Sequence, residues 1–156
     1  MRIREDGRHR HRHRRLLSAP VAAALIILGF TGCTSPTSSL LQAATDARSA
    51  VSSAQLAVSQ QKSDRTFVTT TSTALGDAIT ELGSAEQSAT EVAPSTPAET
   101  AAQKRTLREI RTATDAVLAA QRVVLTDAGS ALPALRASTS DLTKLADDLQ
   151  KAEAKK

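Results

Sequence analysis

Apolar residues recur along this chain with helical spacing from about residue 40 to the C-terminus. The first stripe recurs at intervals of 4 and 3 residues and consists of Leu40, Ala44, Ala47, Val51, Ala54 and Val58. Since a helix has about 3.6 residues per turn, such a stripe lies on one helical face. It predicts a helix over 40–61, and three further stripes predict helices over 66–90, 98–127 and 133–156.

Small residues occupy many stripe positions, so the helices can approach one another closely. The three later stripes are Leu75, Ile79, Leu82, Ala85 and Ala89; Leu107, Ile110, Thr114, Val117, Gln121, Val124 and Ala128; and Leu135, Leu142, Leu145, Leu149 and Ala152. Two glutamines, Gln55 and Gln121, lie at the edge of their stripes. Solvent exposure explains them better than a hydrogen bond between helices.

The sequence signals for helix boundaries differ in strength from one helix to the next. Pro94 and Pro97 break the chain over 94–97, and Thr96, Pro97 and Glu99 follow the order of N-cap, first-turn proline and capping-box acid. We therefore expect the third helix to begin here. Gly129 is the candidate C-cap of that helix. The second helix opens with β-branched residues, which are poor helix formers, so its start is the least defined boundary.

These elements predict an all-α fold, an antiparallel bundle of about four helices spanning residues 40–156. A motif of Ala, Val and Gln around Val51 recurs around Val117, 66 residues later, and Leu75 and Leu82 match Leu142 and Leu149 at an offset of 67. A duplicated helical hairpin and chance similarity in an Ala-rich helical sequence explain this recurrence equally well.

Residues 1–32 have the composition of an export signal rather than of a folded element. Seven arginines lie within residues 1–15, and residues 16–30 carry no charge. At 15 residues, this apolar run is shorter than the roughly 20 that a membrane-spanning helix needs. A basic segment, an apolar segment and small residues follow one another in the order of a signal peptide. Arg14 and Arg15 leave the choice between general and twin-arginine export open.

The segment Phe30-Thr31-Gly32-Cys33 resembles the lipobox of bacterial lipoproteins, with Phe30 where Leu is usual. The resemblance implies that the Cys33 thiol is acylated and that cleavage precedes Cys33. The implied location is the extracytoplasmic face of the cell membrane, and the implied first partner is the lipid bilayer. Cys33 is the only cysteine, so no disulfide can form within the chain. Residues 33–39 would then form a lipidated, polar tether.

Removal of the predicted signal peptide, residues 1–32 (the leader), would change the net charge of the chain. Of 20 Lys and Arg residues, 7 lie in residues 1–32, as do 2 of the 16 acids, so residues 33–156 carry 13 basic and 14 acidic residues. Non-specific nucleic-acid binding depends on clustered cations, and single-strand binding on aromatic platforms. Phe67 is the only aromatic residue after Cys33. We expect no nucleic-acid partner.

The side chains left after Cys33 restrict the chemistry. All 3 histidines lie in the leader, and residues 34–156 contain no His, Cys, Tyr, Trp or Met. Nucleophile–histidine systems and Cys/His zinc sites therefore have no candidates. The acidic pair Asp147 and Asp148 is better explained as a solvated helix face than as a site. We expect no enzyme and no cofactor.

The sequence thus favours a lipid-anchored, non-catalytic module that binds another protein of the cell envelope or acts as a scaffold. The alternative is a structural spacer, because the C-terminal lysines Lys155 and Lys156 are similar to those by which Braun-type lipoproteins join peptidoglycan. A third class, carriage of a small molecule in the bundle core, has no motif that supports it.

Overall fold

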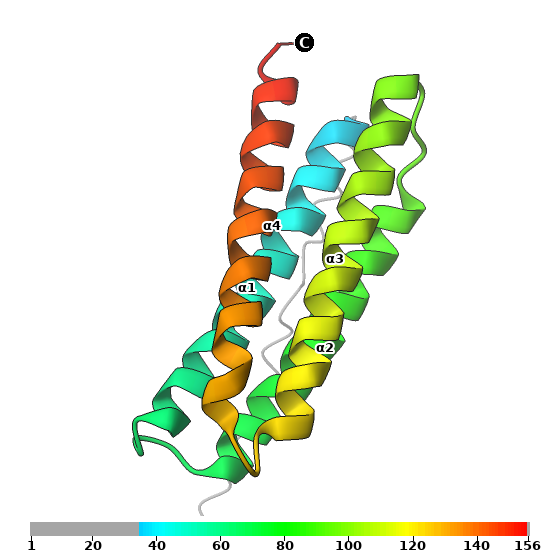
Figure 1. Ribbon diagram of the computed structural model, residues 1–156. Coiled ribbons are helices and arrows are strands. Elements are labelled where there is room, and N and C mark those ends of the chain that lie inside the picture. Colours follow the sequence, from blue (N-terminus) through cyan, green and yellow to red (C-terminus); the bar gives the residue numbers. More distant parts are fainter. Residues whose placement is uncertain (1–34, 156) are drawn as a thin grey trace, which may run out of the picture. The chain divides into compact units, whose positions relative to one another are not determined.

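The computed structural model describes residues 35–155, which form a bundle of four long helices and contain no strand (Figure 1). The helices are α1 (Pro36–Lys62), α2 (Val68–Glu91), α3 (Pro97–Val123) and α4 (Leu132–Glu153), and a short 3-10 helix, η1 (Ala128–Ala131), precedes α4. The predicted all-α fold class is confirmed.

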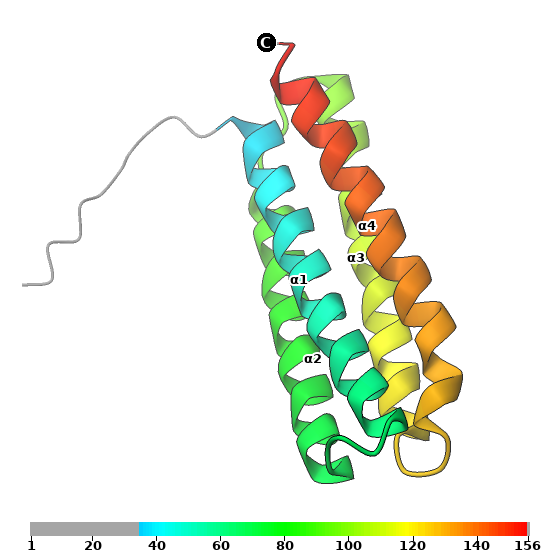
Figure 2. The same cartoon turned by 90° about the vertical axis from the view of Figure 1, so that its left-hand side faces the viewer.

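Successive helices run antiparallel, so the bundle has two distinct ends (Figures 1 and 2). The proximal end holds Ser35, the α2–α3 connection (92–96) and the end of α4 (153–155). The distal end holds the α1–α2 loop (63–67) and the segment between α3 and α4 (124–131). At about 1.5 Å per residue, the 27 residues of α1 separate the two ends by about 40 Å.

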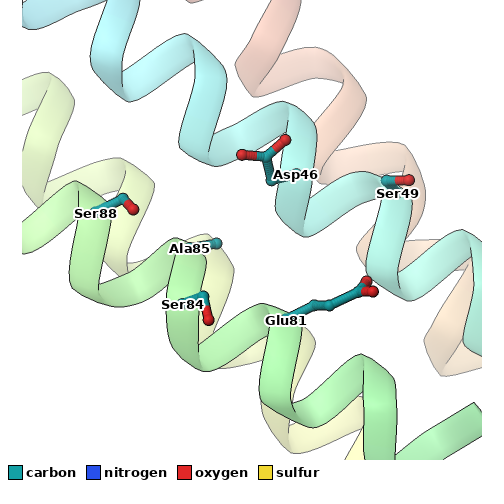
Figure 3. A pocket seen from close by; sticks show the side chains of 6 residues that line it. All are labelled: Asp46, Ser49, Glu81, Ser84, Ala85 and Ser88. Carbon is teal, nitrogen blue, oxygen red and sulfur yellow. The ribbon is translucent and has the colours of Figure 1, made fainter. Parts of the chain in front are cut away.

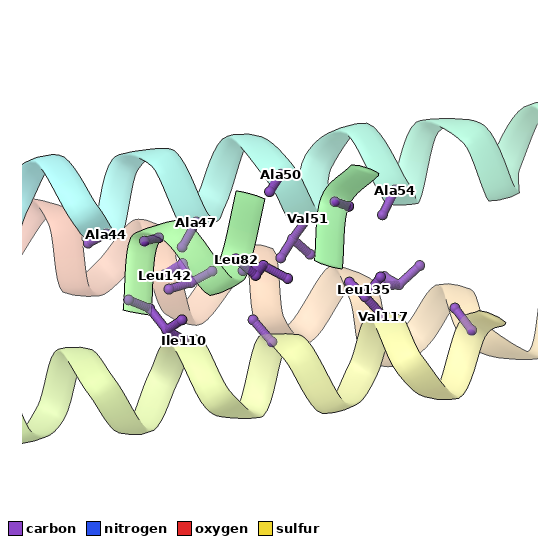
Figure 4. Packing of buried hydrophobic residues seen from close by; sticks show 14 of the residues in the cluster. Ala44, Ala47, Ala50, Val51, Ala54, Leu82, Ile110, Val117, Leu135 and Leu142 are labelled. Carbon is purple, nitrogen blue, oxygen red and sulfur yellow. The ribbon is translucent and has the colours of Figure 1, made fainter. Parts of the chain in front are cut away.

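Alanine on α1 faces larger aliphatic side chains of the other three helices (Figure 4). The buried alanines of α1 are Ala43, Ala44, Ala47, Ala50 and Ala54. They lie against Leu82 of α2, Ile110 and Val117 of α3, and Leu135 and Leu142 of α4. Because alanine is small, α1 packs closely on α2 and α4 and also reaches α3 across the bundle.

The predicted stripes of α1, α2 and α4 are largely buried, whereas that of α3 is displaced. On α3 the buried positions are Glu99, Thr106, Ile110, Ala113, Val117 and Ala120. Gln121 is exposed, as expected for the edge of its stripe, and Thr114 is only half-buried. Small or polar residues occupy both edges of this stripe, so the choice of face depends on the neighbouring helices rather than on the spacing alone.

The first helix begins earlier than predicted. Ser35 is the N-cap of α1 and accepts a hydrogen bond from the backbone N–H of Ser38, and Pro36 opens the helix. Four residues assigned to the tether, 36–39, therefore form the first turn of α1. Serine followed by proline is a favourable helix start, which the apolar stripe could not reveal because it begins only at Leu40.

Two predicted caps had different outcomes. The capping box is confirmed: Thr96 Oγ1 accepts from the Glu99 N–H at 3.1 Å, and the Glu99 carboxylate accepts from the Thr96 N–H at 3.2 Å. The prediction for Gly129 was wrong, because α3 ends at Val123 and Gly129 lies within η1 with a negative φ.

Asp64 closes the C-terminus of α1 in the left-handed conformation, with φ of 55°. The N–H of Arg65 donates to the Gln60 carbonyl at 2.9 Å, and that of Asp64 donates to the Gln61 carbonyl at 3.0 Å. This bond pattern is the Schellman motif, in which glycine is the usual residue and aspartate is tolerated. It fixes the direction in which the chain leaves α1.

Glutamine side chains close two other helix ends. Gln103 Nε2 on α3 donates to the carbonyls of Ala89 at 3.0 Å and Val92 at 2.8 Å, at the end of α2. Gln61 Nε2 on α1 donates to the Val124 carbonyl at 2.7 Å, just after α3. Carbonyls at a helix C-terminus lack intrahelical partners, so both contacts satisfy otherwise free acceptors.

Matched positions of the proposed duplication have matching burial. Val51 and Val117 are fully buried, as are Leu75 and Leu142. The two hairpins differ at the distal end, since the first is joined by loop 63–67 and the second by a segment containing η1. Similar burial fits both a duplication and a shared bundle geometry, so the duplication stays a prediction.

Candidate functional site

The one predicted modification site, Cys33, and the lipobox Phe30-Thr31-Gly32-Cys33 lie outside the described residues, as does the signal segment 1–32. In sequence, Cys33 stands two residues before the N-cap Ser35. No helix among residues 35–155 is long and apolar enough to cross a bilayer.

Exposed apolar side chains lie toward the distal end. Phe67, in the α1–α2 loop, is 82% exposed, and Leu125, just after α3, is 76% exposed. Leu56, in the second half of α1, is 59% exposed. Among the described residues, these are the large hydrophobic side chains left open to solvent. Exposed aromatic side chains are frequent anchors of protein interfaces, whereas single exposed aliphatic side chains are common on any protein surface.

Charged residues accompany the apolar side chains at the distal end. Lys62 and Arg65 are exposed and lie within the five residues that precede Phe67 in the sequence, and Arg122 is exposed shortly before Leu125. The aliphatic stem of Lys62 lies over Gly129, where an added Cβ would come within 3.1 Å of it. This contact holds the end of α1 against η1. The distal end thus combines exposed apolar side chains with exposed charged side chains.

A shallow groove runs between the proximal halves of α1 and α2 (Figure 3). It consists of two adjoining hollows of about 380 and 550 Å³ that share Asp46 and Ser88. Figure 3 shows Glu81 extending from α2 toward α1, near Ser49. Ser84 completes this wall, and Glu91 lines the hollow nearer the proximal end. We call it the α1–α2 groove.

Hydroxyls and carboxylates are the main chemical groups of the α1–α2 groove. The Asp46 carboxylate accepts a hydrogen bond from Gln42 Nε2 at 2.8 Å, and that of Glu91 accepts from Gln87 Nε2 at 2.9 Å. Neither these carboxylates nor Glu81 forms an ion pair within residues 35–155. No group of three metal-ligating side chains occurs in the same range. The groove is suited to accept hydrogen bonds from a cationic surface.

Cations are concentrated on α3. Lys104, Arg108 and Arg111 line its outer surface around the half-buried Leu107. Arg111 Nε bonds Glu86 of α2 at 2.7 Å, and Arg105 bonds Asp148 of α4 at 2.9 Å. Such exposed pairs contribute little stability each, about 0–1 kcal/mol. They show that Arg111 lies level with Glu86 of α2 and that Arg105 lies level with Asp148 of α4.

No family model matches this chain, and neither the curated proteins nor the solved structures contain a match. Function must be inferred from the residues described above.

Sequence reasoning missed several of these features. The exposure of Phe67 could not be foreseen, because a lone aromatic residue is more often buried than exposed. The capping roles of Gln61 and Gln103 depend on which helix ends meet, which periodicity does not reveal. The separation of acids on α2 from bases on α3 is visible in the sequence, but the groove that places Asp46 beside Glu81 is not.

Proposed function

We propose that this chain is a membrane-anchored, non-catalytic protein-binding module of the cell envelope, acylated at Cys33 on the extracytoplasmic face. The proposal rests on the lipobox resemblance for the anchor and on the surface of the bundle for the binding role. Its lipid partner is the bilayer, and its protein partner is another envelope protein. Neither catalysis nor a cofactor is part of this function.

One observation carries the binding role: the exposed apolar residues Phe67 and Leu125 lie at the distal end. The described chain begins at the proximal end, two residues after Cys33. An anchor at Cys33 would therefore hold the proximal end against the headgroups and present the distal end about 40 Å away. A partner that covers Phe67 would remove a large apolar side chain from water, which favours association.

The short tether supports the same function. Because 36–39 belong to α1, only Cys33, Thr34 and Ser35 separate the lipid from the first helical turn. Three extended residues reach roughly 10 Å. A bundle held this close to the membrane has restricted reach and orientation, which suits a module that positions a partner at a defined height.

The course of α4 favours the binding module over the spacer. A spacer that joins lipid to peptidoglycan needs its two attachment points far apart. Ser35 Oγ instead donates a hydrogen bond to the Glu153 carboxylate at 2.7 Å, so the last turn of α4 lies beside the start of α1. Lys155 follows two residues later. Four antiparallel helices thus return Lys155 to the proximal end.

Site-specific photo-crosslinking in the native cell tests the proposal. A benzophenone analogue of phenylalanine replaces Phe67, whose exposure leaves room for the larger ring. We expect a discrete crosslinked protein in the membrane fraction and at least a fivefold loss of that product when Leu125→Ser is added.

The matched control places the same analogue at Thr80, an exposed position of α2 away from the distal end. Equal products from both positions, or no product from Phe67, would contradict a distal binding surface. Circular dichroism of each variant excludes loss of the bundle as the cause, because the far-UV signal reports helix content.

A further inference from the structure

Charge is unequally divided between two neighbouring helices. α2 carries Asp77, Glu81, Glu86 and Glu91 and has no Lys or Arg. α3 carries Lys104, Arg105, Arg108, Arg111 and Arg122 against three acids. One side of the bundle is therefore acidic and another is basic, although residues 33–156 are almost neutral as a whole. Such a split creates complementary surfaces on one molecule.

The acidic surface is the α1–α2 groove. Its carboxylates, Asp46, Glu81 and Glu91, form no ion pair within the described chain. The hydrogen bonds that Asp46 and Glu91 accept come from neutral amides on their own helices. The charge of all three is thus uncompensated at short range, and the serines between them leave the groove accessible to long side chains.

The basic surface is the outer face of α3, where Lys104, Arg108 and Arg111 outnumber Asp115 and where Arg111 also pairs with Glu86 of its own chain. Lys104 makes no ion pair within residues 35–155, and Arg108 contacts only its neighbour Glu109, at 3.7 Å. The side chains of Arg108 and Arg111 are 68% and 65% exposed. These cations are long enough to reach into a shallow groove on another molecule.

The two surfaces lie at the same height along the bundle. Gln103 bonds the carbonyl of Val92, which places Lys104 close to the level of Glu91. Arg111 bonds Glu86, which places it near the middle of the groove. The cations span about 10 Å along α3, and the groove from Glu81 to Glu91 spans about 15 Å along α2, at about 1.5 Å per residue. Two parallel copies placed side by side at the same height therefore bring Lys104 opposite Glu91 and Arg108 opposite the hollow that Asp46 and Ser88 line.

We propose that the basic face of α3 in one copy docks into the α1–α2 groove of a second copy, with the two bundle axes parallel. The parallel orientation is the one that two copies anchored in the same membrane would adopt, and in this respect the inference rests on the proposed function. The charge pairing itself does not depend on the anchor. Because different surfaces meet, the contact is heterologous and can extend to rows of copies.

The association is weak and depends on salt. Exposed ion pairs are screened beyond about 8 Å at physiological ionic strength, and each contributes little. Confinement of the copies to one membrane raises their effective concentration and compensates for the low affinity. The dimer should therefore form at the membrane and disappear from detergent extracts at high salt.

Photo-crosslinking of the full-length chain in its own membrane tests the inference. The benzophenone analogue is placed at Ser84, inside the groove, and in the control at Ala137, an exposed position of α4. We expect a homodimer from Ser84 that is absent from Ala137. The double charge reversal Lys104→Glu and Arg108→Glu should lower the dimer yield at least fivefold.

Charge swapping keeps the test decisive. Asp46→Lys with Glu91→Lys should also abolish the dimer, whereas a chain that carries all four reversals should regain it. All these residues are exposed, so the helices should be retained and the far-UV spectrum should be unchanged.

Three results would overturn the inference: a dimer indifferent to the reversals, equal yields from Ser84 and Ala137, or a crosslinked species of another mass. The last would assign the groove to a different protein. Failure of this inference would not change the crosslink expected at Phe67, because that experiment probes the distal end of the bundle.

Discussion

Ser35 and Glu153, 118 residues apart, meet at the proximal end of the bundle. The Ser35 hydroxyl lies 2.7 Å from both carboxylate oxygens of Glu153 and also accepts the Ser38 N–H at 3.1 Å. One side chain thus caps α1 and links it to the last turn of α4. A link at this position keeps the segment next to Cys33 attached to the folded bundle.

Ser35→Ala should destabilise the protein by about 1–2 kcal/mol, because it removes both the N-cap and a hydrogen bond to a charged acceptor. Urea unfolding followed by far-UV circular dichroism measures this, since the chain has no Trp or Tyr to serve as a fluorescent probe. Ser52→Ala, at an exposed position of α1, is the control and should change stability by less than about 0.5 kcal/mol.

A double-mutant cycle separates the two roles of Ser35. If Glu153→Ala costs the same in the Ser35→Ala background as in the wild type, then the link between α1 and α4 contributes nothing and only the cap matters. We expect instead a coupling of at least about 0.5 kcal/mol between the two substitutions.

Gln103→Ala should destabilise the bundle by about 1–2 kcal/mol, because the carbonyls of Ala89 and Val92 lose their donor at the end of α2. Gln121→Ala, at an exposed position of the same helix, is the matched control and should be nearly neutral. Equal unfolding midpoints for the two variants in urea would mean that the Gln103 contacts carry no net stability.

Ala47→Leu should lower stability by about 1–3 kcal/mol, even though leucine is more hydrophobic than alanine. Ala47 is fully buried where α1 approaches its neighbours, so a larger side chain forces the helices apart. Ala119→Leu, at an exposed position of α3, supplies the comparison and should leave the thermal midpoint almost unchanged. A gain in stability at Ala47 would show that the bundle is loosely packed there.

Helix number, helix order and most core positions followed from the sequence, because amphipathic spacing reports burial directly. The capping box of Thr96 and Glu99 was equally predictable, since it depends on residues three positions apart. The tether was overestimated because proline and serine were attributed to a linker, although Ser35 and Pro36 together start a helix. Residues close together in the sequence were sufficient to predict features that depend only on those residues.

Contacts between distant segments were not predictable in the same way. Periodicity missed the buried Ala113 and Ala120 of α3, because only neighbouring helices select among similar small residues. The pairing of Ser35 with Glu153 and the groove between Asp46 and Glu81 depend on which helices lie side by side. The candidate surfaces therefore emerged from the structure, whereas the candidate anchor Cys33 came from the sequence.

Membrane partition of the full-length chain and of Cys33→Ser in the native cell tests the central claim most directly. Two acyl chains on Cys33 would hold the protein firmly, since each buried CH2 contributes about 0.8 kcal/mol. The account predicts that the wild-type protein sediments with membranes and that Cys33→Ser loses this association while it retains its helical spectrum. A Cys33→Ser protein that still sediments with membranes, in the same proportion as the wild type, would contradict the account.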